Sequence, residues 1–510
     1  MYKVRVLQEI DDRLDAEYYN PAALSTLKKM ENKGTVTTFG SLVNEGYRVV
    51  YHGTDSINGL KDSELLPFLS PTQIDPNGAI SFDDADKLPL YYKERYPKGL
   101  AKVGEILVEV KGNVSKVGIV PLDFPKNLMI SGSLYKATLD PKRADSHYVL
   151  AFLKSRHGQI LKNRLTSNTI INYIAKDALY SIPVIEFGEK AQKHIGDKVR
   201  QAEQLRAWAK RLRTSVDEKL NGLNLPINEP PQLLNRVSAQ TMEDRLDPRP
   251  YRSHFLHLVS EIEKLPHDSI SSVVGLASGC PVSSKDFLEN AGIPLVRIRN
   301  IGFDDFIGLD TGVSKDVYQD ASKYQAKEKM VVVGMDGIFR SQFFVADELP
   351  MLVNQRVAML VPQKIRGELL THWLNRPEGQ MQLNQWAVKT TVEHTSLTDI
   401  GRVLIPRLDE RLENKLADDL LNARLANRYA KFLTQTAKTL VEALIEGQLT
   451  EKQLIQAQQA LDDGDNSLEQ AILSKISGEG YAIEGAKPLF SDMDELYRLM
   501  ESAAQAETEE

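Results

Sequence analysis

The sequence contains the same short pattern twice, and this duplication constrains the fold more than any other feature. The residues Asp12-Arg13-Leu14-Asp15, followed by Tyr19, return as Asp244-Arg245-Leu246-Asp247, followed by Tyr251. Both matches lie 232 residues apart (244 minus 12 and 251 minus 19). Because this period is far too long for a solenoid, it indicates a duplicated domain.

Each copy opens a long mixed segment that ends on an apolar-Pro step. The first segment ends at Ser181-Ile182-Pro183 and the second at Leu404-Ile405-Pro406, and a charged, helix-forming run follows each of them. The order is therefore globular segment, helix, globular segment, helix. A duplicated recognition unit of this kind suggests a two-part target.

Apolar residues recur at steps of three and four along both charged runs, which predicts two long helices with one apolar face each. In the first helix, from about 189 to 220, these residues are Ile195, Val199, Ala202, Leu205, Ala209, Leu212, Val216 and Leu220. In the second, from about 410 to 446, they are Leu412, Leu416, Leu420, Ala423, Ala426, Ala430, Leu433, Ala437, Leu440 and Leu444. Each face packs either on its own globular segment or on the other helix. The similar lengths and near-3.5 spacing favour an antiparallel coiled coil.

Both globular segments combine strand-like and helix-like stretches. The first has an apolar strand at 105–110 and a helical stretch at 148–161, and the second has a strand at 330–333 and a helical stretch at 367–385. We therefore expect an α+β fold made of two tandem α/β domains, with the two helices relating them as a pseudo-two-fold internal repeat.

The pattern of elements predicts six regions along the chain. They are a first globular domain (1–185), a first long helix (186–223), a Pro- and Asn-rich linker (224–243), a second globular domain (244–407), a second long helix (408–449) and an acidic, partly helical tail (450–510).

Composition places the chain among ordinary soluble proteins. Of its 510 residues, 42% are hydrophobic and 26% charged, and no apolar run approaches the ~20 residues needed to cross a bilayer. The N-terminus leads into no signal segment and the single cysteine, Cys280, allows no internal disulfide, so we expect a reducing, cytoplasmic location and no membrane contact.

Net charge is −7, but residues 450–510 hold 14 acidic and 4 basic residues, which leaves +3 for the rest (−7 minus −10). A local basic surface for nucleic acid is therefore compatible with the negative total.

Catalytic and metal-binding motifs give no support for an enzyme. The chain has no Gly-rich phosphate loop, and Asn228-Glu229-Pro230-Pro231 has the wrong order for the Asn-Pro-Pro-aromatic motif of amino-methyltransferases. His254, His257 and Glu261 share the spacing of a helical zinc site, but two histidines on a helix surface are the more common explanation. We expect no metal and no catalytic residue.

Polar and basic residues at turns of the second domain are the better candidates for function. Arg297 and Arg299 fall on one face of an expected strand at 292–301, and a Gly-bounded turn at 334–342 carries Arg340, Ser341 and Gln342. Asn354-Gln355-Arg356 precedes a further strand. Arg pairs with guanine and Asn or Gln with adenine in the major groove, although solvated loop positions are the simpler explanation for any single residue.

Together these features resemble the specificity subunit of type I restriction-modification systems, over about residues 13–449. The resemblance rests on the order of domains and helices and on the opening segment Arg13-Leu14-Asp15-Ala16-Glu17-Tyr18-Tyr19-Asn20-Pro21. It also rests on 292–301, on Asp336-Gly337 followed by 353–357, on the closing Ile-Pro steps, and on the helix ending at 440–447. The first domain departs from the second: Lys111-Gly112 stands where the second has Asp336-Gly337, and Ser131-Gly132-Ser133 where it has Asn354-Gln355-Arg356. Such divergence is expected if each domain recognises a different half-site.

The resemblance implies a non-catalytic subunit that binds a bipartite site in double-stranded DNA. It implies two adenine-N6 methyltransferase subunits as partners, which would bring S-adenosylmethionine, and, in a restriction complex, motor-nuclease subunits that would use ATP and Mg²⁺. The chain itself would hold no cofactor.

The expected contact residues divide into two sets. Candidate DNA-binding residues are Arg48, Tyr51, His52, Lys111, Asn113, Lys116, Lys285, Arg297, Arg299, Asn300, Arg340, Ser341, Gln342, Asn354, Gln355, Arg356, Lys389 and Thr390. Candidate partner-binding residues on the long helices are Arg206 and Arg213, which are expected to be exposed, and Arg424 and Arg428.

Three other functions stay open at this point, one of which is an unrecognised enzyme, which a methyl-transfer assay on the isolated chain would reveal. The same fold could recognise DNA for another methyltransferase-based phage-defence system, which the neighbouring genes would reveal. The helices could instead form a coiled-coil scaffold that never touches DNA, which a gel shift with the partner present would test.

Overall fold

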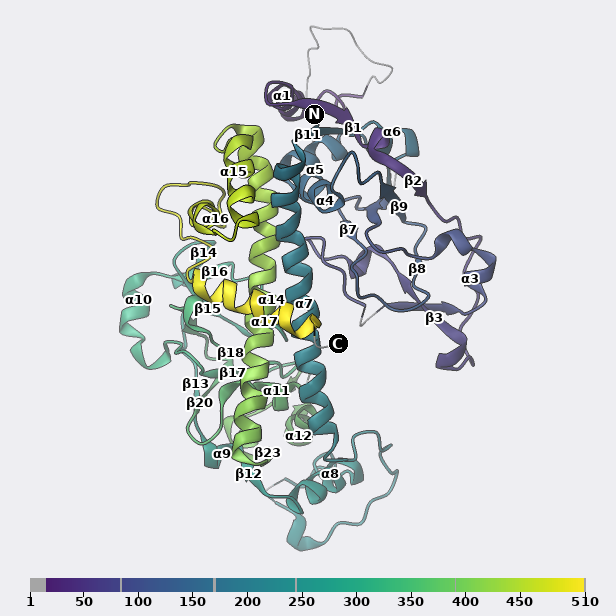
Figure 1. Ribbon diagram of the computed structural model, residues 1–510. Coiled ribbons are helices and arrows are strands. Elements are labelled where there is room, and N and C mark those ends of the chain that lie inside the picture. Colours follow the sequence, from purple (N-terminus) through teal and green to yellow (C-terminus); the bar gives the residue numbers. More distant parts are fainter. Residues whose placement is uncertain (1–14, 83–84, 168–170, 244, 390, 509–510) are drawn as a thin grey trace. The chain divides into compact units, whose positions relative to one another are not determined.

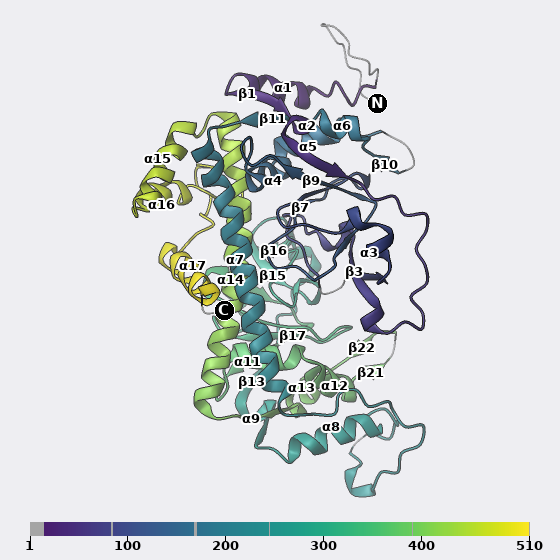
Figure 2. The same ribbon diagram turned by 45° about the vertical axis from the view of Figure 1, so that its right-hand side comes forward.

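The computed structural model describes residues 15–82, 85–167, 171–243, 245–389 and 391–508. Its elements are traced in Figures 1 and 2, and they form two compact units. Unit 1 consists of Met1–Ala207 and Tyr429–Glu510, and unit 2 of Trp208–Arg428. The sequence analysis drew domain boundaries at the ends of the long helices. The compact units are divided differently, because each of them includes part of both long helices.

The described part of the first repeat, in unit 1, forms short helices around small sheets. Its helices are α1 (Pro21–Glu31), α2 (Phe39–Leu42), α3 (Tyr92–Arg95), α4 (Ser146–Lys154), α5 (Arg156–Asn163) and α6 (Lys176–Tyr180). Its strands are β1 (Thr35–Thr38), β2 (Val43–Tyr47), β3 (Leu65–Leu69), β4 (Asp86–Pro89), β5 (Ile106–Glu109), β6 (Lys111–Gly112), β7 (Val117–Ile119), β8 (Met129–Ile130), β9 (Leu134–Leu139), β10 (Asn172–Tyr173) and β11 (Pro183–Glu186).

The described part of the second repeat, in unit 2, has a closely similar set of elements. Its helices are α8 (Ser253–Glu263), α9 (Ile270–Val273), α10 (Lys315–Asp320), α11 (Gly367–Asn375), α12 (Pro377–Trp386) and α13 (Leu397–Arg402). Its strands are β12 (His267–Ser269), β13 (Val274–Ser278), β14 (Leu288–Glu289), β15 (Ile293–Val296), β16 (Thr311–Val313), β17 (Val331–Gly334), β18 (Ser341–Phe343), β19 (Leu352–Val353), β20 (Val357–Pro362), β21 (Val388–Lys389), β22 (Glu393–His394) and β23 (Leu404–Pro406).

The duplication seen in the sequence is confirmed as a duplication of the fold. Helices α1 and α8 start and end 232 residues apart (253 minus 21 and 263 minus 31). The main sheet has the order β2-β9-β5-β7 in the first repeat and β13-β20-β17-β18 in the second, and all its strand pairs are antiparallel. In each repeat one further pair is parallel, β3 with β8 and β15 with β19.

The start of α1 shows why this element forms where the repeat begins. Asn20 is its N-cap, and the side chain accepts a hydrogen bond from the backbone N–H of Ala22 at 2.9 Å. Pro21 occupies the first turn, where its missing N–H costs nothing. Ala23 and Met30 then bury the inner face of the helix.

The two long helices are α7 (Glu189–Asn221, 33 residues) and α14 (Glu410–Glu446, 37 residues), close to the expected ranges. In unit 1, Ile195 and Val199 of α7 share a buried core with Leu440 of α14. In unit 2, Val216 of α7 shares a core with Leu416 of α14. The start of α7 therefore packs with the end of α14, and the end of α7 packs with the start of α14. This arrangement confirms an antiparallel pair. The apolar faces also pack on the globular parts, so both packing modes expected from the sequence occur together.

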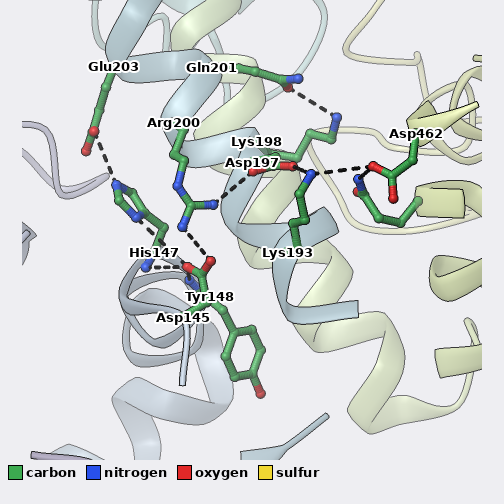
Figure 3. Close-up of polar contacts among 11 residues, drawn as sticks. Asp145, His147, Tyr148, Lys193, Asp197, Lys198, Arg200, Gln201, Glu203 and Asp462 are labelled. Atoms are coloured by element: carbon green, nitrogen blue, oxygen red, sulfur yellow. Dashed lines mark hydrogen bonds and ion pairs between the residues drawn. The ribbon is translucent and has the colours of Figure 1, made fainter. Parts of the chain in front are cut away.

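Polar contacts fasten α4 of unit 1 to the outer side of α7 (Figure 3). Asp145 caps α4 by accepting the backbone N–H of His147 at 2.8 Å, and the same carboxylate forms an ion pair with Arg200 of α7. Arg200 also donates to Asp197 at 2.9 Å, and His147 Nε2 lies 3.3 Å from Glu203. The cap that starts α4 thus also fixes its position against the long helix.

The acidic tail folds into α15 (Glu451–Asp462), α16 (Ser467–Leu473) and α17 (Met493–Thr508), all in unit 1. Lys198 of α7 and Glu469 of α16 form an ion pair in which both side chains are 2% exposed, and Tyr497 of α17 donates to the same carboxylate at 2.7 Å. Burial, reinforced by the charge of Lys198, lowers the pKa of the nearby His194 imidazole to about 3, so this side chain is neutral. The tail is therefore partly helical, as expected, and an integral part of the unit 1 core.

Membrane insertion finds no support in the described ranges. None of the helices there combines the length and the apolar composition that a bilayer span requires.

Candidate nucleic-acid interface

The first repeat brings several of the expected DNA-binding residues to one corner of its sheet, where β5 ends and β10 lies beside β6. We call the group Arg48, Lys111, Asn113, Gly132 and Tyr173 the first corner. Arg48 Nε donates to the carbonyl of Gly132 at 2.6 Å, and its guanidinium also donates to the Tyr173 hydroxyl at 3.2 Å. Tyr173 pairs with Lys111 across the β10–β6 ladder, and Lys111 and Asn113 are exposed.

A buried carboxylate that sequence reasoning missed shapes this corner. Glu109 is 4% exposed and accepts backbone N–H groups from Asn113 (3.2 Å), Ser115 (3.0 Å) and Lys116 (3.1 Å). Gly112 adopts φ of +120°, which favours glycine at the tight turn. The only signal in the sequence is an acidic residue inside an apolar strand, because a buried Glu needs several donors.

Three further candidates from the first domain have mixed positions. The Tyr51 ring packs edge-on against Phe68 and Tyr96, and its hydroxyl donates to the Ile130 carbonyl at 2.9 Å. Burial raises the pKa of Tyr51 well above its usual value, so it is a neutral core residue. Lys116 Nζ donates to the carbonyl of Ile74 at 2.7 Å, and His52 is exposed.

The second repeat forms an equivalent corner, where β17 ends and β22 passes. We call Asp336, Gln355, Arg356, Lys389 and His394 the second corner. His394 Nδ1 lies 2.5 Å from Asp336 Oδ1, and Arg356 Nε lies 3.9 Å from the other oxygen of this carboxylate. The Arg356 side chain is 60% exposed and that of Lys389 is 67% exposed, and Gln355 is also exposed.

The two corners match in backbone and differ in chemistry. Lys111-Gly112 and Asp336-Gly337 both follow the third strand of their sheets, and Gly337 has a positive φ of +73°, like Gly112. Tyr173 in the first corner corresponds to His394 in the second, since each is the second residue of its short strand. The same frame therefore presents different side chains in the two repeats.

Three predicted contact residues turn out to be buried. Asn300 (1% exposed) donates to the carbonyl of Ile307 at 2.9 Å, Ser341 (0%) to that of Thr371 at 3.0 Å, and Gln342 (1%) to that of Phe303 at 3.1 Å. Strand β18 begins at Ser341, so the expected turn is shorter than its glycines suggest. A buried side chain cannot reach a base edge; Asn300 and Gln342 hold loops instead, and Ser341 holds helix α11.

The arginines of the second domain also differ from the expected arrangement. Strand β15 ends at Val296, so Arg297 and Arg299 do not share a strand face. Arg297 lies over the Phe287 ring at 5.6 Å, and Arg299 forms an ion pair with Asp310.

Of the remaining candidates in the described part of the second domain, Arg340 and Asn354 lie between strands, and Lys285 lies in a short 3-10 helix. Arg340 lies 4.9 Å over the Phe303 ring. Asn354 is half-buried, Lys285 is exposed, and Thr390 lies outside the described residues.

The four arginines expected to bind partners make contacts within their own unit. Arg206 donates to Thr434 of α14 at 2.8 Å, and Arg213 forms an ion pair with Asp304. Arg424 is 3% exposed and Arg428 is 17% exposed by side chain, and both bind Glu348. The docking surface expected from these arginines is therefore wrong for Arg424, and it is not supported for the other three.

The histidines with zinc-like spacing do not share a ligand site. His257 lies 2.8 Å from Glu229 of the linker and 3.3 Å from Glu261, which hold its ring on the helix surface. These contacts raise the pKa of His257, with the Glu229 hydrogen bond as the main cause. His254 packs against the Phe255 ring instead.

Comparison with known proteins gives one curated relative and several solved structures. No family model matches the chain. The Type I restriction enzyme EcoBI specificity subunit of Escherichia coli is 26% identical over 194 residues, 36% of this chain. The chain spans 39% of the length of that relative, and this alignment supports the resemblance found in the sequence.

Solved structures of the same kind are similar over most of the chain. One is a type I restriction-modification S subunit from M. genitalium, with a TM-score of 0.43, 16% identity and coverage of 81% of this chain and 95% of that chain. Another is the HsdS subunit from Thermoanaerobacter tengcongensis, with a TM-score of 0.28, 13% identity and coverage of 82% and 97%.

Proposed function

We propose that this chain is the sequence-specificity subunit of a type I restriction-modification complex. It selects a bipartite DNA site for partner adenine-N6 methyltransferase subunits, two in number, and in a restriction complex also for motor-nuclease subunits. The observation that carries the proposal is that the duplicated fold presents two equivalent polar corners with different side chains. Such a pair of corners suits a DNA target whose two halves differ in sequence.

The chemistry of the reaction would then belong to the partners. The corners offer Arg, Lys, Asn and Gln side chains, which pair with base edges and phosphates. S-adenosylmethionine would be bound by the methyltransferase, which would also extrude the target adenine, and ATP with Mg²⁺ by the motor subunit. The chain contributes recognition and assembly.

The proposed function is tested by a methyl-transfer assay with labelled S-adenosylmethionine. The isolated chain should transfer no methyl group and cut no DNA, and adding the methyltransferase subunit should give methylation at one bipartite sequence. Sequencing the methylome of the host with and without the gene should show the same sequence lost on deletion. Methyl transfer by a partner-free preparation would contradict the proposal.

Replacing Arg356 by alanine should relax recognition of one half-site. An exposed guanidinium that makes a bidentate base contact discriminates by ~1–3 kcal/mol, so the variant should accept altered bases in that half and keep its preference in the other. Binding to a panel of single-base variants measures this. Lys264→Ala, which removes another exposed cation of unit 2, serves as the matched control and should leave the preference unchanged. A uniform loss over all sequences would mark Arg356 as a phosphate contact instead.

A further inference from the structure

We propose that the first corner contains a pocket for one unpaired nucleobase of the bound DNA, and that the second repeat has no such pocket. The inference rests on the proposed function, because the base is presented by the DNA that the chain recognises. It adds a ligand-binding role in one repeat alone to the recognition that both repeats share.

The lining of the pocket fits a planar ring next to a negative charge. The pocket has a volume of about 310 Å³ and is lined by Tyr47, Arg48, Tyr135, Tyr173 and Lys176, with a glycine and three aliphatic residues completing the wall. This volume lies at the lower end of ligand sites, which span ~300–1,000 Å³. The lining contains three aromatic rings and two cations but no carboxylate, so it suits an aromatic, neutral or anionic group such as a nucleotide.

Contacts with neighbouring groups hold Arg48, Tyr173 and Tyr47 of the pocket in place. Arg48 is fixed by Gly132 and by the Tyr173 hydroxyl, and its guanidinium lies 5.4 Å from the Tyr173 ring centre. Tyr47 has the Lys98 ammonium 5.6 Å from its ring centre. A base stacks on rings of this kind whatever its identity, because every base has a π face.

The floor of the pocket is built by a close approach that only glycine permits. The hydroxyls of Tyr135 and Tyr180 lie 2.9 Å apart, and a Cβ on Gly46 would fall 2.6 Å and 2.5 Å from them. Burial, and then the hydrogen bond to Tyr180, raises the pKa of Tyr135 above its usual value, so the floor is neutral. The shape is therefore formed before any ligand binds, which reduces the cost of ordering on binding.

The second repeat replaces two of these three rings with small residues at the equivalent positions of its main sheet. Tyr47 of β2 pairs with Lys136 of β9, and the equivalent pair in the second repeat joins Ala277 of β13 to Met359 of β20. Tyr135 is the second residue of β9, and the second residue of β20 is Ala358. The three tyrosine rings belong to the first repeat alone, since only the imidazole of His394 stands in the second repeat at the position of Tyr173, so they are no requirement of the shared fold.

The ligand is an extrahelical base because a base within the duplex cannot enter a concave pocket. Proteins bind such a base by extruding it, and a base without a pairing partner is extruded at lower cost. An abasic site placed opposite one base of the recognised sequence removes the partner of that base. The change in DNA affinity then measures how strongly the pocket binds the unpaired base.

The test uses the complex of the full chain with its methyltransferase and the duplex identified by the methylome. An abasic site opposite one position in the half-site recognised by unit 1 should raise affinity about tenfold, as base–aromatic stacking allows. Abasic sites opposite the bases of the other half-site should give no gain that depends on the tyrosines of unit 1. Tyr47→Leu and Tyr173→Leu should each abolish the gain, and Tyr173→Phe should keep it.

Tyr91→Leu is the matched control, since Tyr91 is 48% exposed in the same unit and outside the pocket, and it should keep the gain. Thermal unfolding shows whether each variant is folded, and Arg48→Gln offers a second variant if a tyrosine variant is not. A gain that persists in folded Tyr47→Leu and Tyr173→Leu, or no gain at any position, overturns the pocket while DNA binding stands. Binding of free deoxynucleoside monophosphates without an abasic gain also overturns it, in favour of a nucleotide site. Failure to bind the duplex at all rejects the proposed function itself.

Discussion

Replacing Arg424 by leucine should destabilise unit 2 by about 3–5 kcal/mol, the usual cost of removing one partner from a buried ion pair. Arg424 donates to both carboxylate oxygens of Glu348, at 2.8 and 2.9 Å, and the two side chains are 3% and 2% exposed. Arg428 adds a third contact at 3.2 Å. Without Arg424, Glu348 would lose its main hydrogen-bond partner in a site that water does not reach. Urea unfolding followed by circular dichroism measures the loss.

The pH dependence of this loss has a definite sign. Burial raises the pKa of Glu348 to about 7, against the opposing pull of Arg424 and Arg428. A carboxyl with a raised pKa binds more protons in the folded state, so stability falls as pH rises from the unfolded value of about 4.3 to about 7. Loss of Arg424 raises this pKa further, so the destabilisation by Arg424→Leu should be nearly constant between pH 4.5 and 7 and increase as pH rises above 7.

Two further variants separate the buried charge from general damage to α14. The double variant Arg424→Leu with Glu348→Leu should recover most of the lost stability, because neither charge is then left alone. Arg299→Leu breaks a pair whose side chains are 52% and 48% exposed, and it should cost less than about 1 kcal/mol. If Arg424→Leu costs no more than Arg299→Leu, the buried pair does not hold α14 to its unit.

The sequence predicted the long helices well because their signal is local and repeats many times. The apolar positions of α7 and α14 give their faces, and the expected ranges of about 189–220 and 410–446 lie close to the observed Glu189–Asn221 and Glu410–Glu446. The repeat predicted the duplicated frame in the same way, since a match at offset 232 needs no knowledge of contacts. Both inferences depend on patterns that the chain itself displays.

The sites were harder to predict because burial of a polar side chain depends on partners that are distant in the sequence. Gln342 looks like a surface residue of a turn until β18 is known to start one residue earlier and its amide is seen to meet Phe303. Arg424 looks like a solvated helix position until Glu348, 76 residues away, is placed beside it. By contrast, the signals for Lys111 and Arg356 are local: Lys111 adjoins the turn glycine Gly112, and Arg356 belongs to a short polar run directly before a strand.

Lengthening both long helices by one heptad should change the spacing of the recognised half-sites by about three base pairs. Seven residues add ~10 Å at 1.5 Å per residue, and DNA rises ~3.4 Å per base pair. The proposed function gives each repeat one half-site, and the boundary between the compact units falls at Ala207/Trp208 in α7 and at Arg428/Tyr429 in α14. Heptads inserted at both points, with the apolar pattern kept in phase, leave the packing within each unit intact.

The methylome of a host that carries the lengthened chain is the measurement, and the non-specific gap in its methylated sequence should be longer than in the wild type. Three base pairs also turn the duplex by about 100°, at 10–10.5 base pairs per turn, so we expect a weaker affinity for the longer site than the wild type has for its own. A heptad inserted in α7 alone is the control. It shifts part of the apolar residues of α7 by seven positions relative to their partners on α14, so it should reduce stability without defining a new spacing of half-sites. An unchanged gap with undiminished affinity in the doubly lengthened chain would show that the helices do not set the distance between half-sites, and the two corners would then have to be positioned on DNA by the partner subunits.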